Sequence, residues 1–232
     1  MLAELADAAP LFLYGAGVTV LYTVLAAVAA LVVSFVFGLM SLSGSVVVRG
    51  LSRTVVEFFR GTSLVIQLLW IFFVLPQLGL RFEPMAAATL AFGLNFGAYG
   101  AEIVRGAIAS VPRPQWEATI ALGLGRFRRM RRVILPQALP EMVPPFGNLW
   151  IQILKSSSLL YLIGITELTF EVKQLQFQVG SMAAFSIALV VYFVLAQALV
   201  AVTRWVETRT AARLGRGPRA VVITQPGTVG TP

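Results

Sequence analysis

The chain has 232 residues, of which 58% are hydrophobic and 12% are charged, with a formal net charge of +8 and neither histidine nor cysteine. Soluble domains carry about 25% charged residues, so this apolar excess predicts burial in lipid rather than in one soluble core. The missing histidine and cysteine exclude a hydrolase triad, a disulfide and any metal site built on those ligands. We therefore expect no catalytic residues, no metal and no cofactor.

Five segments are mainly apolar and close to the length of about 20 residues that a membrane helix needs. In chain order they are residues 11–40, 62–80, 85–108, 142–165 and 181–202. Polar stretches separate them, and Pro76 interrupts the second segment near its end. The sequence therefore predicts an all-α polytopic membrane protein with five transmembrane helices.

Basic residues gather on one side of these predicted spans. The loops after the first and third spans and the tail contain fifteen arginines, counting Arg105 at the end of the third span, whereas the opposite loops contain only Arg81 and Lys173. Because Lys and Arg mark the cytoplasmic face, this bias places the C-terminus in the cytoplasm and the N-terminus outside. The acidic residues Glu4 and Asp7 agree with an N-terminus outside. Because the first nine residues contain no Lys or Arg, they indicate a retained terminus rather than a secretory signal. The same bias explains the net charge, so we expect no nucleic-acid partner.

The segment 110–141, between the third and fourth predicted spans, is too long and too regular for a simple connector. Residues 115–122 can form a short helix, and Gly123 predicts a turn because glycine tolerates a positive φ. Residues 126–135 predict a second helix that stops at Pro136.

This second helix is basic and amphipathic. Its apolar residues recur at helical spacing between arginines, and they are Phe127, Met130, Val133 and Ile134. The residues alone leave three interpretations open: a helix on anionic lipid headgroups, a solvated charged face, or a docking element for a cytoplasmic partner.

The spacing of this loop resembles the EAA signature of bacterial ABC-importer permeases. That signature reads Glu-Ala-Ala, three residues, Gly, nine residues, an aliphatic residue, one residue and Leu-Pro. The matching residues are Glu117, Ala118, Thr119, Gly123, Val133, Leu135 and Pro136. Thr119 replaces the second alanine and Val133 the usual isoleucine. The resemblance implies an ABC type I importer transmembrane domain in which 110–141 is a coupling loop that docks on a separate ATPase, with Glu117 meeting a partner cation or capping the turn.

The resemblance extends over about residues 11–205. The segments 57–62, 95–112 and 154–168 resemble the polar-amino-acid branch of these permeases, although Ser63 stands where that branch usually has proline. With Ser63 and the segment 67–76, the chain resembles most closely the permeases for ectoine and hydroxyectoine. This implies transport of amino acids or amino-acid-like compatible solutes.

The same resemblance implies the setting in which the chain works. The permease domain would cover residues 1–208 and lie in the bacterial plasma membrane. A flexible tail, basic at first and then Gly/Pro/Thr-rich, would follow over residues 209–232. The partners of the chain would be an ABC ATPase, a second permease subunit, identical or homologous, and an extracytoplasmic solute-binding protein. The sequence contains no Gly-Lys-Ser/Thr phosphate loop, so we expect no enzyme activity here and ATP hydrolysis on a separate chain.

Polar residues at membrane depth are costly and usually face a cavity or a partner. The candidates for a substrate path are Asn95, Tyr99, Glu102, Lys155, Ser156 and Ser157. Structural roles stay open beside this one: Glu102 can pair with Arg105, Lys155 can reach towards the membrane surface, and the serines can bond to their own helix. The alternative function is an ATP-independent secondary transporter or channel subunit, for which Glu102 is the one candidate coupling acid.

Overall fold

The computed structural model describes the backbone of residues 2–213 and the side chains of residues 10–210. The side chains of Glu4 and Asp7 and the predicted tail from residue 214 onward lie outside this part. Within residues 2–213 every regular element is a helix, so the predicted all-α fold is confirmed there.

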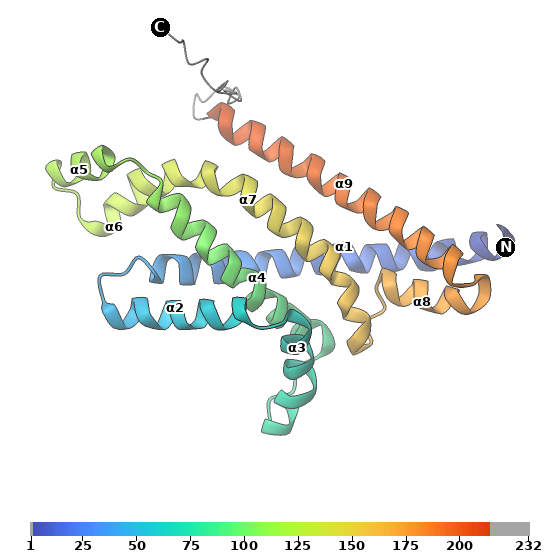
Figure 1. Cartoon of the computed structure of the whole chain (residues 1–232). Coiled ribbons are helices and arrows are strands. Elements are labelled where there is room, and N and C mark those ends of the chain that lie inside the picture. Colours follow the sequence, from blue (N-terminus) through green and yellow to red (C-terminus); the bar gives the residue numbers. More distant parts are fainter. Residues whose placement is uncertain (1, 214–232) are drawn as a thin grey trace, which may run out of the picture.

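The helices follow one another with short connections (Figure 1). In chain order they are α1 (Leu2–Met40), α2 (Val46–Gly61), α3 (Leu64–Leu69), the π-helix η1 (Trp70–Val74), the 3-10 helix η2 (Leu75–Leu78), α4 (Pro84–Ala109), α5 (Arg113–Ala121), α6 (Arg126–Arg129), the π-helix η3 (Met130–Ile134), α7 (Leu135–Ser156), the 3-10 helix η4 (Ser157–Ile163), α8 (Leu168–Val179) and α9 (Ser181–Arg213). Figure 1 shows α5 and α6 at one end of the long helices, here called the loop end. The start of α1 and α8 lie at the opposite end, here called the α8 end.

Two helices are long and apolar enough to cross a membrane by themselves, α1 over Pro10–Met40 and α9 over Ser181–Thr210. Two bent helix pairs also qualify if each counts as one span, namely Val46–Gly61 with Leu64–Leu78 and Arg126–Ile163 with Leu168–Val179. Length and composition therefore support two to four candidate spans, and the number of five stays a prediction.

The predicted second span, residues 62–80, differs from the structure in length and direction. Its helical part, Leu64–Leu78, turns by 103° from α2 and projects away from the long helices in Figure 1. Fifteen residues reach only about 22 Å, less than the roughly 30 Å of a bilayer core. The residues before it, which looked like a polar connection, form α2, because its arginines share one face and its apolar side chains the other.

The prediction that a helix stops at Pro136 is wrong. The chain stays helical from Arg126 to Ser156, through Pro136 and the later prolines of α7. The reason is the π-helix directly before Pro136, in which the Leu135 N–H bonds to the Met130 carbonyl one residue further back than in an α-helix. This wider turn lets a residue without an N–H enter the helix. The same arrangement precedes Pro76, where the Leu75 N–H bonds to the Trp70 carbonyl.

The close packing of α1 on α4 forms the centre of the molecule. A Cβ added to Gly93 would come within 2.9 Å of the Ala29 Cβ, and one added to Gly97 would collide with Val33. Glycine at these two positions therefore allows α1 and α4 to pack at close distance.

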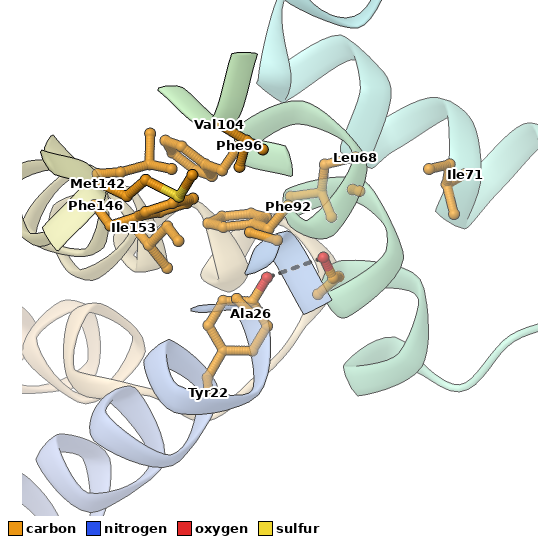
Figure 2. Packing of buried hydrophobic residues seen from close by; sticks show 14 of the residues in the cluster. Tyr22, Ala26, Leu68, Ile71, Phe92, Phe96, Val104, Met142, Phe146 and Ile153 are labelled. Carbon is orange, nitrogen blue, oxygen red and sulfur yellow. Dashed lines mark hydrogen bonds between the residues drawn. The ribbon is translucent and has the colours of Figure 1, made fainter. Parts of the chain in front are cut away.

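A buried aromatic and aliphatic cluster extends this contact to α7 (Figure 2). The Tyr22 hydroxyl of α1 donates to the Ala88 carbonyl of α4 at 2.9 Å, and its ring meets Phe92 edge to face. Phe146 and Ile153 of α7 complete the cluster. These contacts hold α1, α4 and α7 together, so the loop between α4 and α7 starts and ends on packed helices.

Candidate functional site

The segment predicted to be the coupling loop, residues 110–141, is a helix–turn–helix unit built around Gly123. Gly123 has a φ of +67°, a conformation that costs other L-residues about 1–2 kcal/mol. Its N–H bonds to the Ile120 carbonyl at 2.9 Å, and the Leu124 N–H bonds to Thr119 at 3.0 Å. Both bonds close the end of α5, so the turn predicted at Gly123 is confirmed.

One half of the EAA-type residues faces inward. Thr119 is buried, and its hydroxyl bonds to the Trp116 carbonyl at 2.7 Å. Val133 and Leu135 pack against the main core beside the buried Ile134. These apolar residues therefore fix the loop to the membrane helices, and they do not form a surface that a partner could contact.

The other half faces solvent. Glu117, Ala118, Gly123 and Pro136 are exposed, and Glu117 makes no ion pair or side-chain hydrogen bond within the described residues. Leu122 and Phe127, on the two sides of the turn, are each 75% exposed. Five arginines of the same loop are also exposed, Arg113, Arg126, Arg128, Arg131 and Arg132. The loop thus presents exposed apolar and positively charged side chains, on a base that packs against the core.

Asn95, a predicted substrate-path residue, is buried in a network that holds the corner between α2 and α3. Its Nδ2 donates to the Phe59 carbonyl at 3.0 Å and to Gln67 Oε1 at 3.2 Å. Gln67 Nε2 in turn donates to the same Phe59 carbonyl and to the Thr62 hydroxyl, at 3.0 and 2.6 Å. These bonds satisfy carbonyls that the end of α2 leaves free. Asn95 therefore has a positioning role at this corner.

Tyr99 and Glu102 lie one and two turns further along α4, beside α2; Tyr99 is exposed and Glu102 is half-buried. The Tyr99 hydroxyl donates to the Arg60 carbonyl at 3.3 Å, and the Arg60 guanidinium lies 5.3 Å from the centre of the Tyr99 ring. Glu102 pairs with Arg105 at 2.6 Å, as the structural interpretation of this residue expected.

A groove of about 510 Å³ lies between the end of α1, α2 and α4, here called the arginine groove. Its charged lining residues are Arg49, Arg53, Glu57, Arg60, Glu102 and Arg105. Both carboxylates are paired with a neighbour on their own helix, Glu57 with Arg53 at 2.8 Å and Glu102 with Arg105. Arg49 and Arg60 form no ion pair among the described residues.

The remaining substrate-path candidates lie on a different element. Lys155 is exposed near the end of α7, Ser156 ends that helix, and the Ser157 hydroxyl bonds back to the Leu154 carbonyl at 2.7 Å. Within the described residues, no hydrogen bond or ion pair joins Lys155 or Ser156 to the polar residues of α4. The six candidates are therefore two groups rather than one site.

The analysis of the sequence missed Glu167. This side chain is fully buried between η4 and α8, and it accepts hydrogen bonds from the Thr169 and Phe170 N–H groups at 2.8 and 3.0 Å. The Tyr192 hydroxyl of α9 donates to it at 3.0 Å. A single acid three residues after the helix-ending Gly164 and directly before the amphipathic helix α8 was the available signal.

Two further bonds complete this group, here called the Glu167 cluster. Thr19 of α1 accepts the Leu168 N–H at 3.2 Å, and the Thr169 and Tyr192 hydroxyls lie 2.8 Å apart. The cluster therefore joins α1, α8 and α9 at the α8 end of the molecule.

Long apolar helices, a charged groove beside them and a rigid helical loop at one end define a membrane transport subunit with the permease fold of type I ABC importers. The chain belongs to the family of binding-protein-dependent transport system inner membrane components, whose pattern matches residues 30–212.

Relatives of known name agree with this assignment. The probable amino-acid ABC transporter permease protein y4tF of Sinorhizobium fredii is 45% identical over 201 residues, which cover 84% of each chain. The glutamine transport system permease protein GlnP of Escherichia coli K12 is 41% identical over 70% of this chain and 75% of GlnP. This chain is accordingly the permease subunit of an amino acid ABC importer, and it is a transport subunit rather than an enzyme.

Solved structures support the fold. A chain from a crystal structure of an amino acid ABC transporter with histidines superimposes with a TM-score of 0.81 at 31% identity, covering 89% of this chain and 97% of that one. A chain of the MetNI methionine ABC transporter, in an inward facing conformation, has a TM-score of 0.71 at 20% identity and shares the fold. The reported relatives are amino-acid permeases, so they do not support the predicted ectoine specificity.

Proposed function

We propose that this chain forms the translocation path of an amino acid importer in the bacterial plasma membrane, with its coupling loop, residues 110–141, docked on an ABC ATPase. The observation that supports this proposal most directly is the exposure of Leu122 and Phe127 at the tip of the loop. Val133 and Leu135 anchor the base of the same loop in the core. An apolar anchor surrounded by charge has the composition of a protein interface centre. Motion of a partner at this tip would pass directly into α4 and α7, because the loop is continuous with both helices.

The orientation and span number follow from the same proposal. The loop end, which contains most of the arginines, faces the cytoplasm. Five spans result if α1, α4 and α9 each cross once and the bent pairs α2–α3 and α7–α8 each count as one. The N-terminus then lies outside. An extracytoplasmic binding protein would deliver the solute at the α8 end, and a second permease subunit would close the path.

The solute is proposed to be an amino acid. One relative is named for glutamine and another, the TcyB permease of Bacillus subtilis, for L-cystine. Ectoine and hydroxyectoine, as cyclic amino-acid derivatives, are the second candidates because Ser63 replaces the usual proline of the polar-amino-acid branch.

The test is purification of the tagged chain from its own membranes in mild detergent, with the bound proteins identified by mass spectrometry. We expect an ABC ATPase in the wild-type sample and its loss in the Glu117→Arg and Leu122→Asp variants, whose side chains are exposed and leave the fold intact. The co-encoded binding protein, tested for thermal stabilisation by L-glutamine, L-cystine and ectoine, then identifies the solute. Recovery of the active chain without any ATPase would instead support the ATP-independent transporter.

A further inference from the structure

The arginine groove has an excess of positive charge that no ion pair balances among the described side chains, residues 10–210. Four guanidiniums and two carboxylates line it, and each carboxylate already pairs with one guanidinium of its own helix. Arg49 and Arg60 remain, and their polar contacts are neutral: Arg49 donates to the Ser43 carbonyl at 3.0 Å, and Arg60 lies over the Tyr99 ring. The groove therefore favours a ligand with a negative group.

Arg60 lies deep along α2. It is fourteen residues after Val46, which is about 21 Å along the helix axis from the start of α2 at the loop end. Charged side chains at such depth usually face a water-filled cavity, because lipid does not solvate them. Arg49, three residues after Val46, lies near the mouth of the same groove. Two unpaired guanidiniums thus follow one another from the interior towards the loop end.

The position of Arg60 is fixed by its surroundings. The Asn95–Gln67 network holds the carbonyl of the preceding residue, Phe59, and the Tyr99 hydroxyl holds the Arg60 carbonyl itself. The Tyr99 ring supports the guanidinium from one side. A planar guanidinium that is held in place but not neutralised can bind a carboxylate through two parallel hydrogen bonds.

The two faces of α2 distinguish a solute from a lipid. Val47, Leu51 and Phe58 are exposed on one face, whereas the charged residues share the other face with the groove. The apolar face suits lipid or another membrane helix. The charged face therefore belongs to the aqueous side of the helix.

We propose that the arginine groove is a binding site for the carboxylate of the transported solute, with Arg60 as the specificity-determining residue and Arg49 as the second position towards the cytoplasm. The inference rests on the proposed function, since it takes the groove as part of the translocation path. The ammonium end of an amino acid would then lie near Glu57 and Glu102.

The first test uses the absence of native cysteine in the chain. A Ser41→Cys variant places one thiol in the groove lining, where the Ser41 hydroxyl bonds only to the Gly38 carbonyl. In nanodiscs, an anionic methanethiosulfonate should label this thiol about tenfold faster than a cationic one. Adding Arg60→Gln should lower that ratio at least threefold, and Arg81→Gln, an equal charge loss elsewhere, should not. Equal ratios in all three variants would overturn the positive groove.

Competition then identifies the ligand. L-glutamine should slow labelling by the anionic reagent, whereas L-glutaminamide, which lacks the carboxylate, should not. Slowing by phosphatidylglycerol in place of phosphatidylcholine, without any effect of L-glutamine, would assign the groove to lipid headgroups and overturn the solute site.

The second test measures transport by the reconstituted importer with its ATPase and binding protein, for whichever of L-glutamine, L-histidine and L-cystine the wild type imports fastest. Arg60→Gln should reduce the amount of solute imported per ATP about tenfold. Arg60→Lys, which keeps the positive charge but not the planar guanidinium, should reduce it about threefold. Unchanged stoichiometry in Arg60→Gln would overturn the role of Arg60. Failure of the wild type to bind any ATPase would contradict the proposed function instead, while the labelling ratios would still report on the groove.

Discussion

The Glu167 cluster and the loop end differ in whether their polar groups are hydrogen-bonded within the chain. In the cluster, one buried carboxylate accepts from two backbone N–H groups and one hydroxyl, all within this chain. At the loop end, Glu117, Phe127 and the arginines around them are exposed without such partners. Buried polar groups cost free energy unless they are satisfied, whereas exposed ones cost little and remain free for another molecule. The α8 end therefore completes its own structure, and the loop end depends on a partner.

The largest expected effect is on stability at the α8 end. Glu167→Ala leaves the Thr169 N–H, the Phe170 N–H and the Tyr192 hydroxyl without their acceptor, which should lower the free energy of unfolding by about 3 kcal/mol. Circular dichroism during unfolding in detergent measures this change. Gln174→Ala, an exposed position on the same helix, should stay within about 0.5 kcal/mol of the wild type. Similar stability of the Glu167→Ala and Gln174→Ala variants would show that the Glu167 cluster does not stabilise the fold.

The next effect concerns affinity rather than stability. Phe127→Ser removes the apolar tip of the coupling loop, and the ATPase should then bind about thirtyfold more weakly, as for a residue that contributes about 2 kcal/mol. The matched control is Phe177→Ser, because Phe177 is 86% exposed on α8, at the other end. Titration of labelled ATPase against the permease in nanodiscs measures both. Equal weakening of ATPase binding by the two substitutions would show that the loop end and the α8 end do not differ in partner binding.

A smaller effect is expected at the turn of the loop. Gly123→Ala forces an alanine to a φ of +67° and should cost about 1–2 kcal/mol of local free energy, so ATP hydrolysis and uptake become less tightly coupled. Gly125→Ala is the control, since Gly125 has a φ of −61° and open space around its Cβ position. The ratio of solute imported to ATP hydrolysed is the readout. An equal ratio in both variants would mean that the shape of this turn does not matter for coupling.

Local patterns predicted much of the fold and of the loop. The apolar segments predicted the helices α1, α4 and α9, because burial in lipid requires long apolar runs. The turn at Gly123 was predictable for a steric reason that acts within a few residues, since glycine tolerates a positive φ. The course of the chain through Pro136 was not, because a π-helix depends on how the whole segment packs.

The roles of the polar residues needed the structure. Asn95 and Tyr99 were candidates for substrate contact as polar residues at membrane depth, and the structure adds that Asn95 holds the α2–α3 corner and that the Tyr99 ring lies beside the Arg60 guanidinium. Arg60 itself looked like one more basic residue of a connecting stretch. Its depth and its lack of an ionic partner emerge only when α2 lies beside α4.

The sequence by itself determined the membrane setting, the helical class, the family and the position of the loop that resembles the EAA signature, since each follows from composition or from residues close together in the chain. Only the tertiary structure decided which polar groups are satisfied, because hydrogen bonds such as those of Glu167 with Tyr192 join residues that are distant in sequence. The same holds for the arginine groove, whose charge balance is set by three helices together.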